Sequence, residues 1–397
     1  MEGMGPLADI KVIELGTLIA APYCARLLAE FGAEVIKIET PGEGDPLRKW
    51  RRLHEGNSLW WYAQARNKKS VAVNLREPDG QAIVRNLARG ADVVIENFRP
   101  GTLEKWGLGY EALSEGNPGL VMVRISGFGQ SGPYKDRPGF GAIGESMGGM
   151  RYVTGYPDRA PVRVGISIGD SLAAMFGAIG ALSALHHRAA TGKGQVVDVA
   201  LYEAVFAMME SMLPEYGMGG FVRERSGASL PGIVPSNTYP CKDGKYVVIG
   251  ANADSIFKRM MRAIGRPDLA DDPSLATNDG RVKRTEELDR IIGEWTTRHD
   301  LDTVLGVLEK AEVPSGRIYS IADIAADVHY QARGMIERHK LGERDLLLPG
   351  VVPKMSGTPG GTRWIGPRLG EHTGEVLAAL GYTEGEIAAM KERGIVG

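Results

Sequence analysis

Cysteine is scarce in this chain, and so are long hydrophobic runs and any excess of one charge. Two cysteines, Cys24 and Cys241, occur among 397 residues, and they stand far apart in the sequence. This usage argues against a disulfide framework and fits a reducing compartment. We therefore expect a cytoplasmic protein.

Charge and hydropathy argue against two further classes of protein. The chain has 47 Lys and Arg against 49 Asp and Glu, and this formal net charge of −2 provides no electrostatic reason to bind nucleic acid or an anionic membrane. The N-terminus lacks the basic region and apolar run of a signal peptide. The longest uncharged stretch, Ser171–Leu185, is shorter than the roughly 20 residues of a membrane span. We expect neither nucleic acid nor a membrane as a partner.

Glycine, in contrast, is abundant, with 54 residues set among alternating strand and helix patterns. Residues 7–15 predict a strand, 22–31 a helix that begins with proline, and 33–39 a second strand. Such a β-α-β unit is typical of a parallel sheet with crossover helices. The same spacing continues with strands at 71–75, 92–96 and 120–126 and a helix at 78–88. The expected fold class is α/β.

A cluster of Gly, Ser and Pro between residues 217 and 235 favours a domain boundary. Beyond it, a smaller mixed α/β domain is predicted from a strand at 246–250, helices near 253–264 and 285–297, and the segment 301–312. After Arg333 the pattern is irregular until a last amphipathic helix at about 371–380. We predict a large Rossmann-like domain from residues 1–222 and 330–397, and a small domain from residues 223–329.

The segment 161–200 reads as strand, turn, helix, turn and strand, with Asp170 at the first turn. Residues 162–168 alternate as a half-buried strand does, and Ser171–Leu185 is an uncharged helix rich in small residues that Gly192 then ends. Asp170 can cap this helix, which is the commoner role for such a residue. It can also expose its carboxylate as a nucleophile at the carboxyl end of a strand, where α/β folds place their chemistry.

Short motifs in the chain suggest other enzymes. The run GFGQSG at 127–132 matches the GxGxxG of dinucleotide sites, but two prolines stop the helix that should follow. The run GISIG at 165–169 matches the nucleophile elbow of a hydrolase, so a serine thioesterase that uses Ser167 stays an alternative. The same pattern recurs at 144–148, which shows how readily it arises in a glycine-rich chain. The seven histidines show no metal-ligand spacing, and we expect no metal site.

Several longer runs occur in the order of one known family over nearly the whole chain. They are VIKIE at 35–39, NKKSVAVNL at 67–75, VVIENFRPGTLEKWGL at 93–108, ISGFGQSGPY at 125–134, GDSLAAMFGAIGAL at 169–182, TGKGQVVDVALYEAV at 191–205 and LGEHTGEVLAALG at 369–381. Together they resemble the class III CoA-transferases, the CaiB/BaiF family, to which formyl-CoA transferase and alpha-methylacyl-CoA racemase are related.

The resemblance implies an acyl-CoA:carboxylate CoA-transferase in which Asp170 is the nucleophile. Its carboxylate attacks the acyl-CoA thioester to form a mixed anhydride, and the released CoA thiolate then forms an aspartyl-CoA thioester. The substrates are then an acyl-CoA and a small carboxylic acid, with no tightly bound cofactor, and the protein is an interlocked homodimer. The CoA contacts of the family correspond here to Ile19, Ala20, Val73, Arg76, Asn97, Phe98 and Lys105.

Departures from the family's motifs separate its branches. Racemases carry Gly-His-Asp-Ile-Asn-Tyr where this chain has GFGAI at 139–143, so the histidine that shares proton transfer is absent here, although a 2-methylacyl-CoA racemase stays an alternative. Formyl-CoA transferases carry glutamine in place of Ile19 and tyrosine in place of Phe140. The segment PGIVPSNTYPCKDG at 231–244 is more similar to branches that use succinyl-CoA and related dicarboxylic acids.

Overall fold

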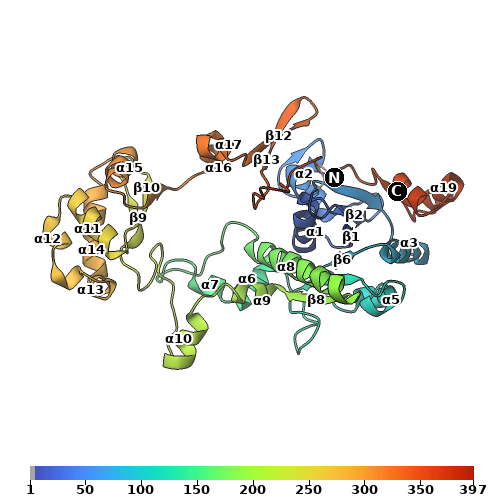
Figure 1. The fold of residues 1–397 in the computed structure, drawn as a ribbon, viewed down its shortest axis with the longest axis horizontal. Coiled ribbons are helices and arrows are strands. Elements are labelled where there is room, and N and C mark those ends of the chain that lie inside the picture. The colour runs from blue at the N-terminus through green and yellow to red at the C-terminus, as the bar shows by residue number, and fades with distance from the viewer. Residues whose placement is uncertain (1–4) are drawn as a thin grey trace. The chain divides into compact units, whose positions relative to one another are not determined.

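The computed structural model describes residues 5–397, and the chain divides into two compact units (Figure 1). The large unit holds the chain up to Arg151 together with Val164–Phe221 and Ala332–Gly397. The small unit holds Tyr152–Arg163 and Val222–Gln331. The domain boundaries expected from the sequence stay a prediction, which assigns Tyr152–Arg163 to the large domain.

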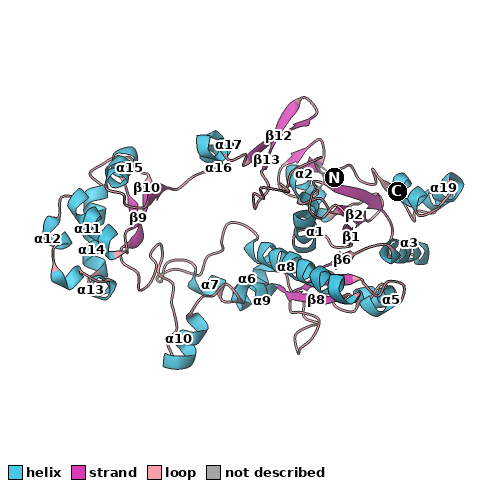
Figure 2. Ribbon diagram, in the orientation of Figure 1, coloured by secondary structure: helices cyan, strands magenta, loops and turns pink. Residues whose placement is uncertain are grey.

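A six-stranded parallel sheet in the order β5-β2-β1-β6-β7-β8 forms the centre of the large unit (Figure 2). Its strands are β1 (Lys11–Glu14), β2 (Glu34–Glu39), β5 (Lys68–Ala72), β6 (Val93–Glu96), β7 (Val121–Ser126) and β8 (Gln195–Ala200). Val12 of β1 lies opposite Val35 of β2 and Val93 of β6. Every residue of β6 and β7 is buried, as expected of parallel strands covered on both faces. The predicted α/β fold with a parallel sheet is therefore confirmed.

Helices cover both faces of this sheet. The helices before Phe221 and after Ala332 are α1 (Ala20–Glu30), α2 (Leu59–Gln64), α3 (Pro78–Arg89), α4 (Thr102–Lys105), α5 (Tyr110–Ser114), α6 (Gly141–Met147), α7 (Met150–Val153), α8 (Ile168–Thr191), α9 (Leu201–Phe206), α10 (Met212–Gly219), α18 (Thr373–Ala379) and α19 (Glu384–Glu392). On one face, Met122 of β7 shares a core with Ile83 of α3. On the other face, Gly177 of α8 lies against Cys24 of α1 and Val123 of β7.

Helix α8 differs from the element expected around Asp170. The strand predicted at 162–168 is absent, because these residues pair with no strand and the apolar side chains of Val162 and Ile166 are exposed. The helix begins at Ile168 instead, and Ser167 occupies the N-cap position. Asp170 is therefore the third residue of the helix, and the predictions that it caps the helix or ends a strand are wrong.

Small residues allow α8 to pack closely on the sheet. A Cβ built on Gly180 would lie 2.4 Å from Val197 Cγ1, so no side chain fits at this position. The helix ends as predicted at Gly192, whose φ of 72° is in the left-handed region that favours glycine. With 24 residues and a mean hydropathy of 1.5, α8 is long and apolar enough to cross a membrane, but half of that window is buried inside the protein. A buried core helix of a soluble protein has the same properties.

The small unit is a mixed α/β structure, as predicted. Its antiparallel sheet has the order β11-β10-β9, from β9 (Ser236–Pro240), β10 (Tyr246–Gly250) and β11 (Ser315–Arg317). The helices between Ala253 and Ala332 are α11 (Asp254–Ala263), α12 (Pro267–Ala270), η2 (Pro273–Leu275), α13 (Asn278–Val282), α14 (Thr285–Thr296), α15 (Leu301–Lys310), α16 (Ile321–Ala326) and α17 (Val328–Ala332). Val247, Phe257, Ile292 and Leu308 contribute to its separate apolar core.

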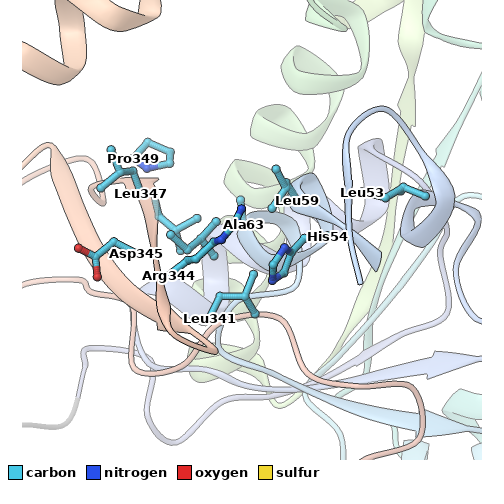
Figure 3. A pocket seen from close by; sticks show the side chains of 11 residues that line it. Leu53, His54, Leu59, Ala63, Leu341, Arg344, Asp345, Leu347 and Pro349 are labelled. Atoms are coloured by element: carbon cyan, nitrogen blue, oxygen red, sulfur yellow. The ribbon is translucent and has the colours of Figure 1, made fainter. Parts of the chain in front are cut away.

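The chain after Arg333, expected to be irregular, forms an antiparallel hairpin of β12 (Ile336–Leu341) and β13 (Arg344–Pro349). The sequence feature that could have predicted this hairpin is Gly342, which begins its two-residue turn with a φ of 59°. This hairpin faces a segment that contains η1 (Pro46–Lys49), β3 (Leu53–His54) and β4 (Asn57–Ser58). Between them lies a cavity of about 520 Å³ whose walls include Leu59 and Leu347 (Figure 3).

Candidate active site

A group of buried charged side chains holds the loop that follows β1. Lys37 Nζ lies 2.7 Å from Glu14 Oε1 and 2.8 Å from Asp45 Oδ2, and it donates a hydrogen bond to the carbonyl of Gly16 at 2.9 Å. Lys68 Nζ lies 2.7 Å from the second oxygen of Glu14. We call Glu14, Lys37, Asp45 and Lys68 the buried ion network. It joins the first three strands of the sheet to the loops at their carboxyl ends.

Burial and pairing shift the pKa values in this region. Burial alone lowers the pKa of Lys37, but the carboxylates of Asp45 and Glu14 outweigh it and raise that pKa above its usual value. Burial lowers the pKa of Lys68 to about 8, because Glu14 offsets only part of the cost. For the Cys24 thiol, burial together with the Glu14 charge raises the pKa to about 12. Cys24 is therefore not a nucleophile at neutral pH.

The loop between β1 and α1 is held from two sides. The backbone N–H of Leu18 donates to Asp45 Oδ1 at 3.1 Å. From the β6 side, Asn97 Oδ1 accepts from the Thr17 N–H at 2.8 Å, and Asn97 Nδ2 donates to the Thr17 carbonyl at 2.9 Å. Both polar ends of the Asn97 side chain are therefore occupied by this loop. Asn97 positions the start of α1 rather than presenting a free amide.

The predicted CoA contacts gather near the carboxyl edge of the sheet. Ile19 and Ala20 follow β1, Val73 and Arg76 follow β5, Asn97 and Phe98 follow β6, and Lys105 ends α4. The carboxyl ends of parallel strands share one edge, which is where open α/β sheets bind ligands. The Phe98 ring packs edge-on against Trp106, the neighbour of Lys105, with centroids 5.4 Å apart. The hydrogen bonds between Asn97 and Thr17 bring the predicted contacts after β1 close to those after β6. Among residues 5–397, no hydrogen bond or ion pair links Arg76 to either group.

Burial separates these residues into two kinds. Ile19, Ala20 and Val73 are buried, so any contact of theirs with CoA would come from the backbone. Arg76 and Lys105 are exposed, and neither forms an ion pair with any residue that the structure describes. Two free cations at the carboxyl edge suit the phosphate groups of a nucleotide. The CoA contacts as a set stay a prediction.

Asp170 lies in the first turn of α8, where unused backbone N–H groups and the helix dipole stabilise negative charge. Its half-buried side chain faces the first residue of α6. A Cβ built on Gly141 would lie 2.1 Å from Asp170 Oδ2, so Gly141 leaves room for the carboxylate that any other residue would remove. The close approach holds the carboxylate beside the backbone of α6.

The spacing of glycines along α6 allows this helix to pack beside Asp170. This packing was not predicted from the sequence. Gly144 packs on Leu201, and Gly148 packs on Val205, so that the helix can lie against α9. Gly144 and Gly148 are the two glycines of the second GxSxG match. Its serine, Ser146, lies within α6 and donates to the carbonyl of Ala142 at 3.2 Å. The recurrence of glycine every three or four residues from 141 to 148 is the signal that predicts this packing.

The other motif matches lack the structure that their chemistry needs. Residues 160–167, directly before the helix, form no strand, so the strand-turn-helix of a nucleophile elbow is not formed. No helix begins directly after Gly132, as the prolines predicted, so the GxGxxG run is a loop. In this loop the N–H of Gln130 donates to Asp198 Oδ2 at 2.9 Å. No group of three or more His, Cys, Asp and Glu suited to a metal ion occurs among residues 5–397.

The site combines a half-buried carboxylate on a helix start, an adjacent glycine backbone and two exposed cations near the edge of a parallel sheet. The sequence model of CoA-transferase family III matches residues 7–373. The chain therefore belongs to CoA-transferase family III and is a CoA-transferase.

Named relatives and a solved structure agree with this assignment. The chain is 52% identical over 394 residues to succinyl-CoA–D-citramalate CoA-transferase of Chloroflexus aurantiacus, with 98% of each chain covered. It is 37% identical over 385 residues to succinate–glutarate CoA-transferase of Agrobacterium fabrum, which covers 94% of this chain and 96% of that enzyme. The crystal structure of a CaiB/BaiF family protein from Brucella suis superposes with a TM-score of 0.84 at 35% identity, covering 95% of this chain and all of that one.

Proposed function

We propose that this CoA-transferase moves CoA from a dicarboxylic acyl-CoA such as succinyl-CoA to a second small carboxylic acid, with Asp170 as the nucleophile. The observation that carries the proposal is the 52% identity, over nearly the whole chain, to an enzyme named for succinyl-CoA and D-citramalate. The relative named for succinate and glutarate also takes two dicarboxylic acids. The half-buried carboxylate at the start of α8 supports the assignment of Asp170.

The reaction proceeds by two exchanges at the Asp170 carboxylate. An Asp170 oxygen bonds to the thioester carbonyl carbon, the C–S bond breaks, and its electron pair leaves with the CoA thiolate. The thiolate then attacks the Asp170 carbonyl carbon of the mixed anhydride, which releases the donor acid as its carboxylate and leaves an aspartyl-CoA thioester. The acceptor carboxylate repeats the two steps in reverse and regenerates Asp170. No tightly bound cofactor takes part in this scheme.

The residues around Asp170 serve this reaction by holding groups in place. Gly141 allows the carboxylate to lie beside α6, and the N–H groups at the start of α8 stabilise charge that develops on the reacting oxygens. Arg76 and Lys105 pair with phosphate groups of CoA. Asn97 holds the β1 loop, which keeps the backbone at Ile19 and Ala20 in position for the carrier.

A substrate panel tests the proposed function. Succinyl-, acetyl- and oxalyl-CoA are each offered with acids of two to six carbons, and new acyl-CoA products are separated by liquid chromatography. We expect kcat/KM for succinyl-CoA to exceed that for acetyl-CoA by about 100-fold, since a site built to pair a polar group discriminates strongly against a donor that lacks it.

Two further experiments without an acceptor acid test the alternative functions. Release of free CoA without any acceptor would indicate a thioesterase, for which Ser167 is the candidate nucleophile. Deuterium uptake from heavy water at the α-carbon of a 2-methylacyl-CoA, again without acceptor, would indicate a racemase. Phe140, which stands in place of the racemase histidine and is 73% exposed, has no group that can move a proton.

We also propose that the protein is a cytoplasmic, interlocked homodimer whose second copy covers α8. Met175, Ile179 and Leu182 form an exposed apolar stripe on this helix, at the spacing of one helical face. Such a stripe on a half-buried helix suits a protein interface better than water. We expect light scattering in detergent-free buffer to yield twice the 42.8 kDa mass of the chain. A stable monomer would contradict the dimer, and a requirement for detergent would favour membrane association.

A further inference from the structure

A second cavity of the large unit lies beside the first turn of α8. Its volume is about 510 Å³. It is lined by Arg51, Arg52, Leu59, Trp60, Ile166, Ser167 and Ser171. We call it the arginine pocket. It is separate from the set of predicted CoA contacts, none of which lines it, and the reaction described above assigns it no role.

The two arginines of this pocket carry unpaired positive charge. Neither Arg51 nor Arg52 forms an ion pair with another residue in the described part of the chain, whereas Arg48, Arg66, Arg124 and Arg188 do so. The guanidinium carbon of Arg51 lies 4.6 Å from the centre of the Trp60 ring. Stacking of this kind orients a guanidinium while its N–H groups remain available to an anion.

The backbone around the arginines is held by local structure. Arg51 has a φ of 60°, a left-handed conformation that costs a residue with a side chain roughly 1 kcal/mol. The carbonyl of Arg52 accepts from the Leu59 N–H at 2.9 Å, and Ser58 Oγ donates to the carbonyl of Trp50 at 2.8 Å. A strained residue kept in place by its surroundings is typical of a functional position.

The preceding segment connects this loop to the sheet. Arg48, three residues before Arg51, is buried and pairs with Glu39 of β2 at 2.7 Å. Its guanidinium also donates to the carbonyl of Pro367 at 3.2 Å. The loop that carries the two arginines thus begins at a buried anchor.

The pocket and Asp170 both lie at the first turn of α8. Ser167 and Ser171 line the pocket, and the Ser171 N–H donates to the Ser167 carbonyl at 3.1 Å. Asp170 lies between these two serines in the first turn of α8, so it is within one helical turn of both. A short molecule that reacts at Asp170 can therefore extend into the arginine pocket.

We propose that Arg51 and Arg52 bind the distal carboxylate of the dicarboxylic acyl group while its other end reacts at Asp170. This inference rests on the proposed function. Arginine binds a carboxylate through two parallel N–H···O hydrogen bonds. The methyl end of a monocarboxylic chain accepts no hydrogen bond, so the two guanidinium groups provide no binding energy for it. The pocket thus selects four-carbon and similar dicarboxylic acids over fatty acids of equal length.

The test compares succinyl-CoA with butyryl-CoA, which has the same number of carbons in its acyl group and a methyl in place of the distal carboxylate. Quenched-flow measurements follow release of the donor acid, succinate or butyrate, in the first half-reaction, in which CoA stays on Asp170 as the thioester and no acceptor acid contributes. We expect the R51Q/R52Q double variant to lose about 100-fold in kcat/KM for succinyl-CoA, the loss typical of hydrogen bonds to a charged group. The rate with butyryl-CoA should change by less than about 3-fold, within the usual effect of a surface substitution.

Arg89→Gln is the matched control, because Arg89 is exposed at the end of α3, outside the pocket. It should leave both donors unchanged, and the R51K/R52K variant should restore part of the selectivity by retaining charge. An equal loss with both donors, or no loss with succinyl-CoA, would overturn the role of the pocket. If the wild-type protein itself prefers butyryl-CoA, the proposed substrate class fails before the arginines are tested, so the two failures are distinguishable.

Discussion

Replacing Asp170 with asparagine is expected to lower kcat of CoA transfer by about 10⁴-fold, the scale seen when a nucleophile is removed from an enzyme. Asparagine has nearly the same shape as aspartate, so it preserves the close packing on Gly141. Its amide cannot form the anhydride. The measurement is steady-state transfer from succinyl-CoA, with thermal unfolding as the check on folding, because an acidic residue in the first turn of a helix contributes about 0.3–1 kcal/mol.

Covalent trapping identifies the nucleophile independently. Wild-type enzyme incubated with acyl-CoA and then treated with borohydride or hydroxylamine should carry its modification at Asp170, located by mass spectrometry. Gly141→Ala should reduce the rate while the carboxylate is intact, because the added Cβ overlaps Asp170 Oδ2. Gly374→Ala is its control, since nothing lies within 4 Å of the added Cβ there. Full activity in Asp170→Asn, or modification of Ser167 instead, would refute the assignment.

The second large effect is expected at Glu14, the centre of the buried ion network. Glu14→Gln should lower the free energy of unfolding by about 3–5 kcal/mol, the usual cost of breaking a buried ion pair. Both Lys37 and Lys68 lie 2.7 Å from this carboxylate, and all three side chains are buried. Removing its charge leaves two ammonium groups with one carboxylate fewer in a site without water access. Urea unfolding followed by circular dichroism measures the change.

An exposed pair provides the control for Glu14. Glu294 and Arg290 lie four residues apart on α14, 2.6 Å from each other, with half or more of each side chain exposed. Glu294→Gln should change the free energy of unfolding by less than about 0.5 kcal/mol, since exposed pairs at this helical spacing contribute little. Similar small effects at both positions would mean that the network adapts to the loss of Glu14, and would contradict its role in holding the β1 loop.

Local patterns predicted the sheet well. The apolar runs at 92–96 and 120–126 correspond to β6 and β7. A strand that is buried on both faces needs continuous apolar residues, so its own sequence is enough to predict it. The same logic failed at 162–168. These residues alternate in the right way, but alternation forms a strand only where a neighbouring strand supplies hydrogen bonds, and none pairs with them.

The candidate site was only partly predictable, because its geometry also depends on contacts with distant segments of the chain. Asp170 could be singled out from its own neighbourhood and from the resemblance to a family, but its place in the helix depended on the absent strand. Asn97 stays a predicted CoA contact, and only the structure shows that both polar ends of its side chain also bond to the β1 loop. None of the motifs found in the sequence includes Arg51 or Arg52. Nothing local indicated that they line a pocket with Ser167, more than 100 residues later.

By itself the sequence determined the parallel α/β class, the end of α8 at Gly192 and the family, because each of these depends on short-range chemistry or on long runs of residues in order. Tertiary structure alone decided that Gly141 lies against Asp170, that Glu14 shares its charge between two buried lysines, and that Arg51 and Arg52 line one cavity with Ser167 and Ser171. These are contacts between segments distant in the chain. Their geometry follows from the packing of whole helices and strands, which no local pattern records.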